Sequence, residues 1–385
     1  MSLPLPVLFL CALPLPQAAE ASREPPDPSQ GEVPLPAAED WQARLLYDGG
    51  EVGIWYVAAV PLVEAHAAPA VIGLDDQGRC LVLTGYSGKW SLRERVHDGA
   101  WLGTLAHADV DPRVEGRELY VAGEAGNVYQ VLAHPQGALD ARFLANLPGR
   151  EVHTLVAADL DLERSGAELL AFTNPGGLWL LTPDGTDGRF RTRSLGAMPG
   201  RVRDAVVLPA GSPGAAPVLL IASRTGTLEE LRFVDGAARR REVFAMATGL
   251  GRLALAPNTA AGTAVVYSTG DDGRVFRHQR DREGAWTHAT IHRGDAGPRG
   301  LAAGRFHADP ALESIAICGY NGKVELLTRR GDKWRAETVF EDRDKGHWLA
   351  VAELDGRNET DELLLTGYGG RIVLLARPPG FGVPE

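Results

Sequence analysis

The sequence predicts an all-β protein, a seven-bladed β-propeller of four-stranded blades, closed by pairing the N-terminal strand with the last blade. Three observations lead to this prediction. A unit of about 49 residues recurs seven times, and a period in this range is typical of propellers and solenoids. Each unit has a Gly-rich tight turn between apolar stretches of strand length. No segment longer than a turn has the apolar spacing of a helix.

The repeating unit is clearest in residues 346–371. A small, apolar first strand (349–352) leads through an acidic turn into a second strand (362–366). A tight turn then opens a third strand from residue 371. Small residues suit innermost strands, where blades crowd toward the axis, and the second strands are rich in Leu and β-branched residues. The first strands are expected to begin near Tyr56, Leu105, Leu155, Asp204, Leu253, Leu301 and Leu349.

Gly-rich turns are expected to join the second and third strands of every unit. Glycine at the end of such a turn supplies the positive φ that a tight hairpin requires. The seven turns are residues 85–88, 123–126, 174–177, 223–226, 270–273, 319–322 and 367–370.

The two ends of the repeat array are incomplete. Residues 41–47 resemble a fourth strand without three strands before it, and the chain runs out after the third strand of the seventh unit. We therefore expect residues 41–47 to pair with residues 371–376. This pairing would build one blade from both ends of the array and remove two open sheet edges.

The N-terminal region predicts export. Residues 1–21 have a short apolar core and a small-x-small cleavage pattern, as in a secretory signal peptide, although a disordered apolar tail is the alternative. Residues 22–40 contain five prolines and are expected to form a solvated linker. The propeller is assigned to residues 41–379 and a tail to residues 380–385. The expected location is secreted or periplasmic.

Composition excludes some partners. The net charge is −11, which makes a nucleic-acid backbone an improbable ligand. Outside the N-terminal region, no run of 18 apolar residues would span a membrane. Cys80 and Cys318 lie in units 1 and 6 and are expected to be buried as small apolar residues, without a disulfide.

Three units share an acidic turn between their first and second strands. Units 2 and 3 have Asp-x-Asp and unit 7 has Glu-x-Asp, each followed by Glu-Leu. This turn resembles the FG-GAP/VCBS repeat of propellers like the N-terminal domain of integrin α chains, in layout over most of residues 41–377. In that family the turn binds calcium, so the resemblance implies Ca²⁺ as a possible ligand. In the other interpretation, which we favour, the acids accept backbone N–H bonds without a metal, because the full ligand set is missing. The candidate ligands are Asp109, Asp111, Asp159, Asp161 and Asp355.

Aromatic and basic residues are expected to gather at one mouth of the central channel. In a four-stranded blade, the loop into the first strand and the hairpin between the second and third strands share one face of the ring. Tyrosines in three Gly-Tyr-x-Gly turns would belong to neighbouring blades once the ring closes. The candidate ligand-binding residues are Trp55, Tyr86, His153, Arg203, Arg252, Arg299, Tyr320, His347, Trp348 and Tyr368.

These residues favour a non-catalytic binding module for a glycan or a partner protein, since rings stack on sugars and Arg forks bind carboxylates or sulfates. The alternative is a polysaccharide lyase acting on uronate polymers, with His347, Tyr368 or Tyr320, and Arg299 as base, acid and carboxylate neutraliser. Some lyases are seven-bladed propellers, which is an analogy at the level of fold. In a third interpretation, the protein is a purely structural scaffold stabilised by calcium. The structural alternative to a ligand site is that the rings only pack between blades or plug the channel. The sequence has no nucleophile elbow, HExxH motif or phosphate loop.

Overall fold

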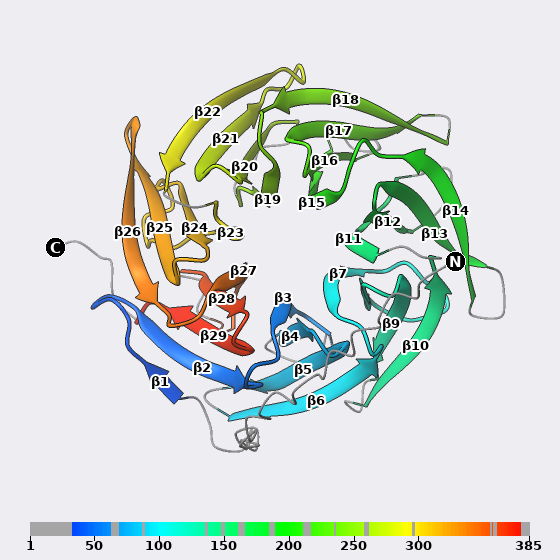
Figure 1. The fold of residues 1–385 in the computed structure, drawn as a ribbon, viewed down its shortest axis with the longest axis horizontal. Coiled ribbons are helices and arrows are strands. Elements are labelled where there is room, and N and C mark those ends of the chain that lie inside the picture. The colour runs from blue at the N-terminus through cyan, green and yellow to red at the C-terminus, as the bar shows by residue number, and fades with distance from the viewer. Residues whose placement is uncertain are drawn as a thin grey trace, which may run out of the picture.

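The fold is a closed ring of seven sheets, seen in a computed structural model (Figure 1). The model describes residues 33–378 except 63–68, 87–88, 135–137, 148–150, 161–165, 185–188, 211–216, 235, 258–261, 295–296, 355 and 357–359. All regular structure in these residues is β-strand, so the predicted fold class is confirmed. The predicted signal peptide (1–21) and the tail (380–385) lie outside the described residues.

Blades 1 to 3 each contain four antiparallel strands in sequence order. Blade 1 consists of β3 (Ile54–Val60), β4 (Ala70–Asp75), β5 (Arg79–Tyr86) and β6 (Lys89–His97). Blade 2 consists of β7 (Leu102–Ala108), β8 (Glu118–Gly123), β9 (Asn127–Ala133) and β10 (Leu139–Asn146). Blade 3 consists of β11 (Glu151–Ala158), β12 (Glu168–Asn174), β13 (Gly177–Asp184) and β14 (Arg189–Ala197).

Blades 4 to 6 follow the same plan. Blade 4 consists of β15 (Val202–Leu208), β16 (Val218–Ser223), β17 (Thr227–Val234) and β18 (Ala237–Ala245). Blade 5 consists of β19 (Leu250–Leu255), β20 (Ala264–Gly270), β21 (Arg274–Arg280) and β22 (Trp286–Arg293). Blade 6 consists of β23 (Gly300–Ala303), β24 (Ser314–Cys318), β25 (Lys323–Arg330) and β26 (Lys333–Glu341).

Blade 7 is built from both ends of the array, as predicted. Its strands are β27 (Gly346–Ala352), β28 (Glu362–Gly367) and β29 (Arg371–Ala376), followed by β2 (Gln42–Asp48) and β1 (Val33–Leu35). The register between β2 and β29 runs from Gln42↔Ala376 to Asp48↔Arg371. In Figure 1, the blue strands β1 and β2 accordingly complete the red blade.

Strand β1 is a fifth strand that the sequence analysis did not expect, since it lies in the segment interpreted as a solvated linker. Val33 pairs with Leu45 of β2, and Leu35 packs against a core cluster that includes Trp41 and Phe340. The Ala38 N–H donates to the Val339 carbonyl of blade 6 at 3.0 Å. A short stretch with two apolar side chains is therefore sufficient to attach this proline-rich segment to the sheet edge.

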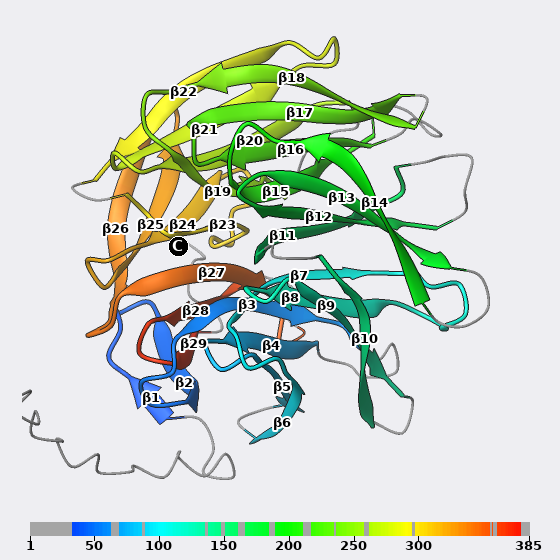
Figure 2. The same ribbon diagram turned by 45° about the vertical axis from the view of Figure 1, so that its right-hand side comes forward.

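The core lies between adjacent blades and not along the axis. Every residue of β4, β8, β16 and β28 is buried, whereas β14, β18 and β26 expose most of their side chains. Cys80 and Cys318 are free and buried, which confirms the prediction, and burial raises the pKa of each thiol to about 12. The turned view shows the blades side by side with their first strands nearest the axis (Figure 2).

Candidate functional site

A β-bulge in the first strand of most blades positions the predicted mouth residues. The pairing between first and second strands skips Trp55, His153, Arg203 and His347 in blades 1, 3, 4 and 7. A bulge inserts one unpaired residue and redirects its side chain. Four of the predicted residues therefore occupy equivalent positions in their respective blades. In blade 2 the skipped residue is Gly103.

Backbone hydrogen bonds attach the turn between the second and third strands to the loop before the first strand. The N–H groups of Asp76, Arg224 and Asp271 donate to the carbonyls of Gly53, Arg201 and Gly249 at 3.0, 2.9 and 2.9 Å. The two loops therefore form one face around the channel, as predicted. We call this face the mouth.

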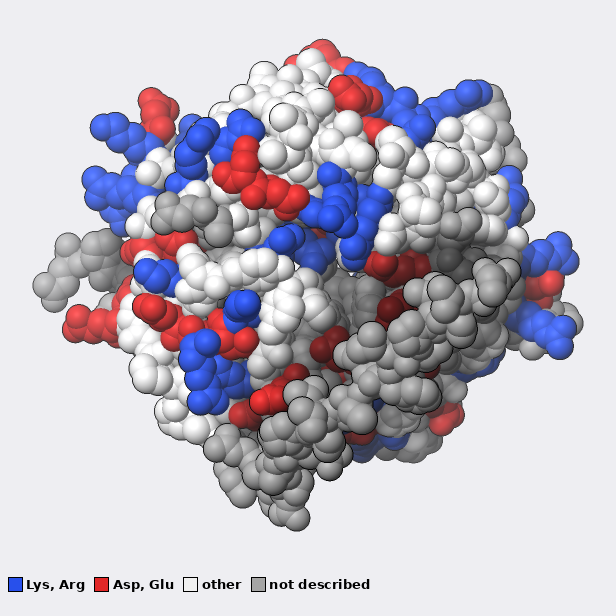
Figure 3. All heavy atoms as spheres, viewed as in Figure 1, with Lys and Arg blue, Asp and Glu red and all other residues white. Residues whose placement is uncertain are grey.

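The mouth holds a pocket of about 250 Å³ lined by five arginines, the arginine pocket. The arginines are Arg201, Arg203, Arg224, Arg252 and Arg299, and His153 and His347 also line the pocket. In the space-filling view, Lys and Arg side chains gather around the centre of the ring near β15 and β19 (Figure 3). None of the described residues that line this pocket is a carboxylate.

Two carboxylates form ion pairs with arginines of the arginine pocket, in addition to the nearby Asp204, whose charge acts on Arg252. Glu151 Oε1 is 2.7 Å from Arg201 Nη2, and Asp271 Oδ1 is 2.7 Å from Arg203 Nη1. Asp271 is also 3.7 Å from Arg299 Nη1, so one acid serves two arginines. Arg224 is exposed and forms no ion pair within the described part of the chain. The pocket therefore has more guanidinium charge than its neighbouring carboxylates neutralise.

Arg252 shows the electrostatic consequence of this crowding. Its guanidinium donates to the backbone carbonyls of Arg203 and Arg299, both at 3.0 Å, and lies 4.0 Å over the Trp348 ring. Desolvation lowers the pKa of Arg252 to about 10, the nearby Asp204 carboxylate opposes this, and the charges of Arg203 and Arg299 add to it. An anion in the pocket would stabilise the charged form of Arg252.

Both histidines of the arginine pocket are neutral near pH 7. Desolvation lowers the pKa of His153 to about 4, and the Arg201 charge adds to this effect although Glu151 opposes it. Desolvation also holds the pKa of His347 well below its usual value, and the charge of Arg252 contributes. His347 Nδ1 lies 3.1 Å from the Trp55 carbonyl and, in a neutral ring, donates to it.

Rings form an arc along the other side of the mouth. The Tyr320 and Tyr368 hydroxyls are 2.9 Å apart, and the Trp55 ring lies 5.0 Å from Tyr368 and 4.6 Å from His347. Trp101, which the sequence analysis missed, continues the arc at 6.4 Å from Trp55. Tyr320 and Tyr368 are 41% and 37% exposed, so a ligand can reach these two rings.

Trp348 behaves differently from the other rings. It is close to Tyr56, at 4.2 Å between ring centroids, as well as to Arg252. Both contacts are made within the protein, so Trp348 packs the inner wall of the channel instead of offering a free ring for stacking.

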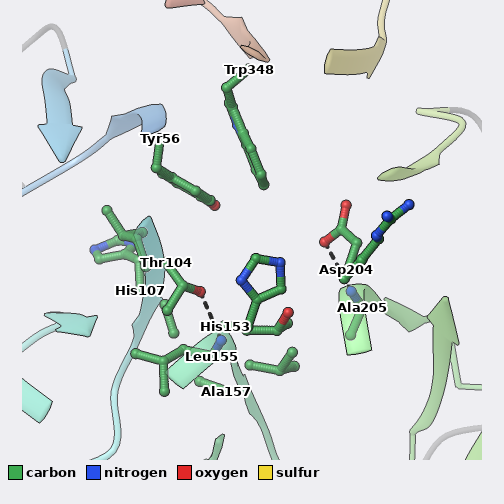
Figure 4. A pocket seen from close by; sticks show the side chains of 14 residues that line it. Tyr56, Thr104, His107, His153, Leu155, Ala157, Asp204, Ala205 and Trp348 are labelled. Atoms are coloured by element: carbon green, nitrogen blue, oxygen red, sulfur yellow. Dashed lines mark hydrogen bonds between the residues drawn. The ribbon is translucent and has the colours of Figure 1, made fainter. Parts of the chain in front are cut away.

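A second cavity of about 180 Å³, the chamber, adjoins the arginine pocket, since His153 and Arg203 line both. In Figure 4, the His153 ring projects into the middle of the chamber, with Tyr56 and Trp348 on one side and Asp204 on another. Desolvation raises the pKa of Asp204 to about 6, against the opposing effects of Arg252 and two backbone N–H donors.

Side chains just after the bulges join neighbouring blades around the chamber. Thr104 Oγ1 accepts the Leu155 N–H of the next blade at 2.8 Å, which Figure 4 marks with a dashed line. Asp204 Oδ2 accepts the Leu253 N–H of its next blade at the same distance. Asp204 therefore has a structural contact as well as a position beside the cavity.

The placement of Tyr86 at the mouth is wrong. The hairpin between β4 and β5 is formed by residues 76–78, and Tyr86 ends β5 at the opposite face of the ring, where it pairs with Lys89. Asp76 occupies the equivalent mouth position and accepts a hydrogen bond from Trp55 Nε1. Tyr86 was assigned to the mouth from its Gly-Tyr-x-Gly pattern, but hairpins at both ends of a blade need tight turns, so the pattern does not identify the end. The repeat spacing instead places the mouth hairpin of blade 1 at residues 75–78, one full unit before the equivalent turn that begins at Gly123.

The acidic turns lie on the opposite face and are organised by glutamate. Glu118, Glu168 and Glu362 begin the second strands of blades 2, 3 and 7. Their Oε2 atoms accept the N–H groups of Val110, Leu160 and Leu354 at 3.0, 2.8 and 2.9 Å.

The predicted calcium ligands are dispersed. Asp111 is fully buried between Arg113 and Arg142, at 2.6 and 2.9 Å, while Asp109 and Asp159 are exposed. Asp161 and Asp355 lie outside the described residues. Among the residues that the structure describes, no three His, Cys, Asp or Glu side chains form a group suited to a metal ion.

Arg201 and Arg224 were missed as members of the site, although both are visible in the sequence. Arg224 occupies the hairpin position that Tyr320 and Tyr368 occupy in blades 6 and 7, where only tyrosine was considered. Arg201 precedes the bulge residue Arg203 by two positions.

Comparison with known proteins shows the fold alone. No family model matches the sequence, and no curated protein matches it. The fold is similar to the WD40 β-propeller domain of Doa1, with a TM-score of 0.58 and 13% identity over 87% of this chain and 96% of that one. It is also similar to the Cps50 (Swd1) β-propeller domain of Myceliophteria thermophila, with a TM-score of 0.58 and 12% identity over 90% of this chain and all of that one. Both neighbours are propellers, and neither supports the FG-GAP assignment specifically.

Proposed function

We propose that this propeller is a non-catalytic binding module for an anionic glycan, recognised at the arginine pocket. One observation carries the proposal: five guanidinium groups line a single pocket, and within the described residues two carboxylates, Glu151 and Asp271, form ion pairs with them. Guanidinium forks match carboxylate and sulfate groups in a bidentate geometry, and the interaction strengthens where water is partly excluded.

The exposed rings of Tyr320 and Tyr368 favour a glycan over an acidic protein segment. They lie next to the arginines, since the Arg299 guanidinium is 4.8 Å from the Tyr320 ring centroid. An acidic pyranose offers a flat apolar face to such a ring, and its acidic group belongs to the same sugar. An acidic segment of a partner protein is the second ligand class.

Binding to de-esterified polygalacturonate, with its fully methyl-esterified form as the neutral control, tests the proposal. We expect binding of the charged polymer only, and a loss of affinity with rising salt. Arg224→Gln should weaken it by up to about fivefold, since an exposed ion pair contributes about 0.2–1 kcal/mol. Isothermal titration calorimetry measures both effects.

Arg335→Gln is the matched control, because Arg335 is exposed on the outer strand β26, away from the mouth. It removes the same charge and should leave affinity unchanged. The proposal fails if carboxylated and sulfated glycans both fail to bind, or if Arg335→Gln weakens binding as much as Arg224→Gln.

The lyase alternative has less support from the geometry. A tyrosine that transfers protons near pH 7 needs a lowered pKa. Desolvation and the hydrogen bond to Tyr320 instead raise the pKa of Tyr368. Following the absorbance of unsaturated products in the same incubations distinguishes the two functions, since a binding module releases none.

Export and family membership are further parts of the proposal. A secreted or periplasmic location is supported by the signal-like pattern of residues 1–21. The FG-GAP/VCBS assignment is supported by the three acidic turns. A calcium-dependent rise in melting temperature would favour the FG-GAP/VCBS assignment. N-terminal sequencing of the exported protein would test whether the signal peptide is cleaved.

A further inference from the structure

Another cavity on the mouth face lies between the edges of blades 5 and 6. This cleft has a volume of about 270 Å³. It is lined by side chains from the end of β22, from the β24–β25 turn and from the start of β25. Those that carry the argument are His292, Arg293, Tyr320, Asn321, Lys323 and Glu325.

The charge of the cleft is unevenly compensated. Arg293 is exposed and Lys323 is half-buried, and neither forms an ion pair within the described residues. Glu325 is the acid among the described residues that line the cleft. His292 Nε2 is shielded from solvent and has no hydrogen-bond partner there. Two cations therefore line a space that has one carboxylate among its described lining residues, and the Asp272 carboxylate acts on Arg293 from outside this lining.

The cleft is continuous with the arginine pocket. Pro298 lines both cavities. Arg299 of the arginine pocket lies over Tyr320 of the cleft, at 4.8 Å from the ring centroid. Tyr320 is 41% exposed, so its ring lies at the boundary where a ligand passing from one cavity to the other would contact it.

We infer that the cleft is a second anion subsite and that the ligand is a linear glycan with acidic groups on successive sugars. One acid binds in the arginine pocket, a sugar ring contacts Tyr320, and a further acid binds between Arg293 and Lys323. This inference rests on the proposed function and adds to it the polymeric nature of the ligand and the direction in which it leaves the mouth.

Two linked subsites make affinity depend on chain length. The second acid binds at a high effective concentration once the first is seated, so a short oligomer binds more tightly than its monomer. Each exposed ion pair contributes about 0.2–1 kcal/mol, so removing both cations should weaken oligomer binding roughly fivefold.

The test compares galacturonate with tetragalacturonate on the full chain. The cleft variant is Arg293→Gln with Lys323→Gln, and its control is Lys333→Gln with Arg335→Gln on the exposed strand β26. We expect the cleft variant to bind tetragalacturonate roughly fivefold more weakly, with a shallower salt dependence, and to bind galacturonate unchanged. The control should bind both sugars like the parent protein.

The outcomes separate the two proposals. If Arg224→Gln weakens tetragalacturonate binding and the cleft variant does not, the second subsite is refuted while the proposed function stands. If the cleft variant weakens binding of a sulfated heparin tetrasaccharide but not of tetragalacturonate, the subsite stands and its anion is sulfate. If neither tetragalacturonate nor the heparin tetrasaccharide binds, or if poly-glutamate binds in their place, the glycan function itself is refuted, and the inference with it.

Discussion

His278 illustrates how burial controls ionisation at the scale of single residues. Its side chain is fully buried, with Nε2 at 2.8 Å from Ser268 Oγ and Nδ1 at 2.8 Å from His288 Nδ1. Desolvation lowers the pKa of His278 to about 3, and His288 adds to this effect. His107 and His307 behave similarly, with pKa values lowered to about 4 mainly by desolvation.

We predict that acid destabilises the fold below pH 6.5. The unfolded chain protonates His278 near pH 6.5, but the folded chain does so only near pH 3, so the unfolded state binds more protons in between. Stability is full above pH 6.5 and should fall by about 1.4 kcal/mol per pH unit for each such histidine. His278→Asn should flatten the pH dependence of the urea midpoint between pH 7 and 5. The exposed His97→Asn should not, and equal slopes for both variants would refute the assignment.

Gly300 is required by the contact between blades 6 and 7. A Cβ at this position would lie 2.9 Å from the Leu349 nitrogen and 2.5 Å from Cys318 Sγ. Gly300→Ala should therefore lower the free energy of unfolding by about 1–3 kcal/mol, as overpacking does. Gly319→Ala is the control, because its nearest contact would be an ordinary 3.5 Å. Equal denaturation midpoints for both variants would show that the blades can separate to accommodate the methyl group.

The site residues differed in how far the sequence could predict them. Trp55, His153, Arg203 and His347 were found because a bulge is placed by the repeat itself. The pairing of Arg201 with Glu151, and of Arg203 and Arg299 with Asp271, could not be predicted, because it depends on side-chain directions across blades. The contacts of Trp348 with Tyr56 and Arg252 could not be predicted for the same reason.

At the scale of elements, the acidic turn explains why a Glu begins three of the second strands. In blade 2, Glu118 Oε2 accepts the Val110 and Asp111 N–H groups and the Tyr120 hydroxyl. Desolvation raises the pKa of Glu118 even though these donors oppose the shift. The turn is therefore held by a protein carboxylate.

We predict that Glu118→Leu destabilises blade 2 while Glu118→Gln largely preserves it. Leucine would leave the Val110 and Asp111 N–H groups buried without an acceptor, which costs about 1–3 kcal/mol for each group. Glutamine retains a carbonyl oxygen in the same position. Urea denaturation monitored by tryptophan fluorescence gives both values. The role of Glu118 as the hydrogen-bond acceptor of the turn would be refuted if the two variants were equally stable.

Element boundaries were predictable where two signals agreed. Apolar strands and Gly-rich turns coincide in blades 2 to 7, and the hairpins fall where expected. In blade 1 the Gly-Tyr-x-Gly pattern and the repeat spacing predict different positions for the hairpin between the second and third strands, and the position from the repeat spacing is correct. Strand β1 could not be predicted, because its three residues acquire strand structure only by pairing with β2.

For the whole molecule, ring closure depends on one strand that is distant in sequence from its partners. Strand β2 lies between β29 and β1, and Trp41 just before it is buried in the core of blades 6 and 7. The Arg377 guanidinium lies over the Trp41 ring and 2.8 Å from Asp40, so both ends of the array meet here.

We predict that two N-terminal deletions differ sharply. A chain that begins at residue 39 lacks β1 but retains β2, and should unfold cooperatively with a modest loss of stability. A chain that begins at residue 49 also lacks β2, which exposes β29 and the core around Leu375, and should aggregate or unfold without a sharp transition. Circular dichroism melting and size-exclusion chromatography measure this difference. Equal behaviour of the two chains would mean that closure is not required.

The shared blade also imposes an order on biosynthesis. Residues 42–48 leave the ribosome before blades 1 to 6 are made, but their neighbours in the sheet, residues 371–376, are made after those blades. Blades 1 to 6 are complete in sequence long before that moment, so they can form one after another during translation. The seventh cannot, and throughout that interval the early segment must remain soluble without its partner.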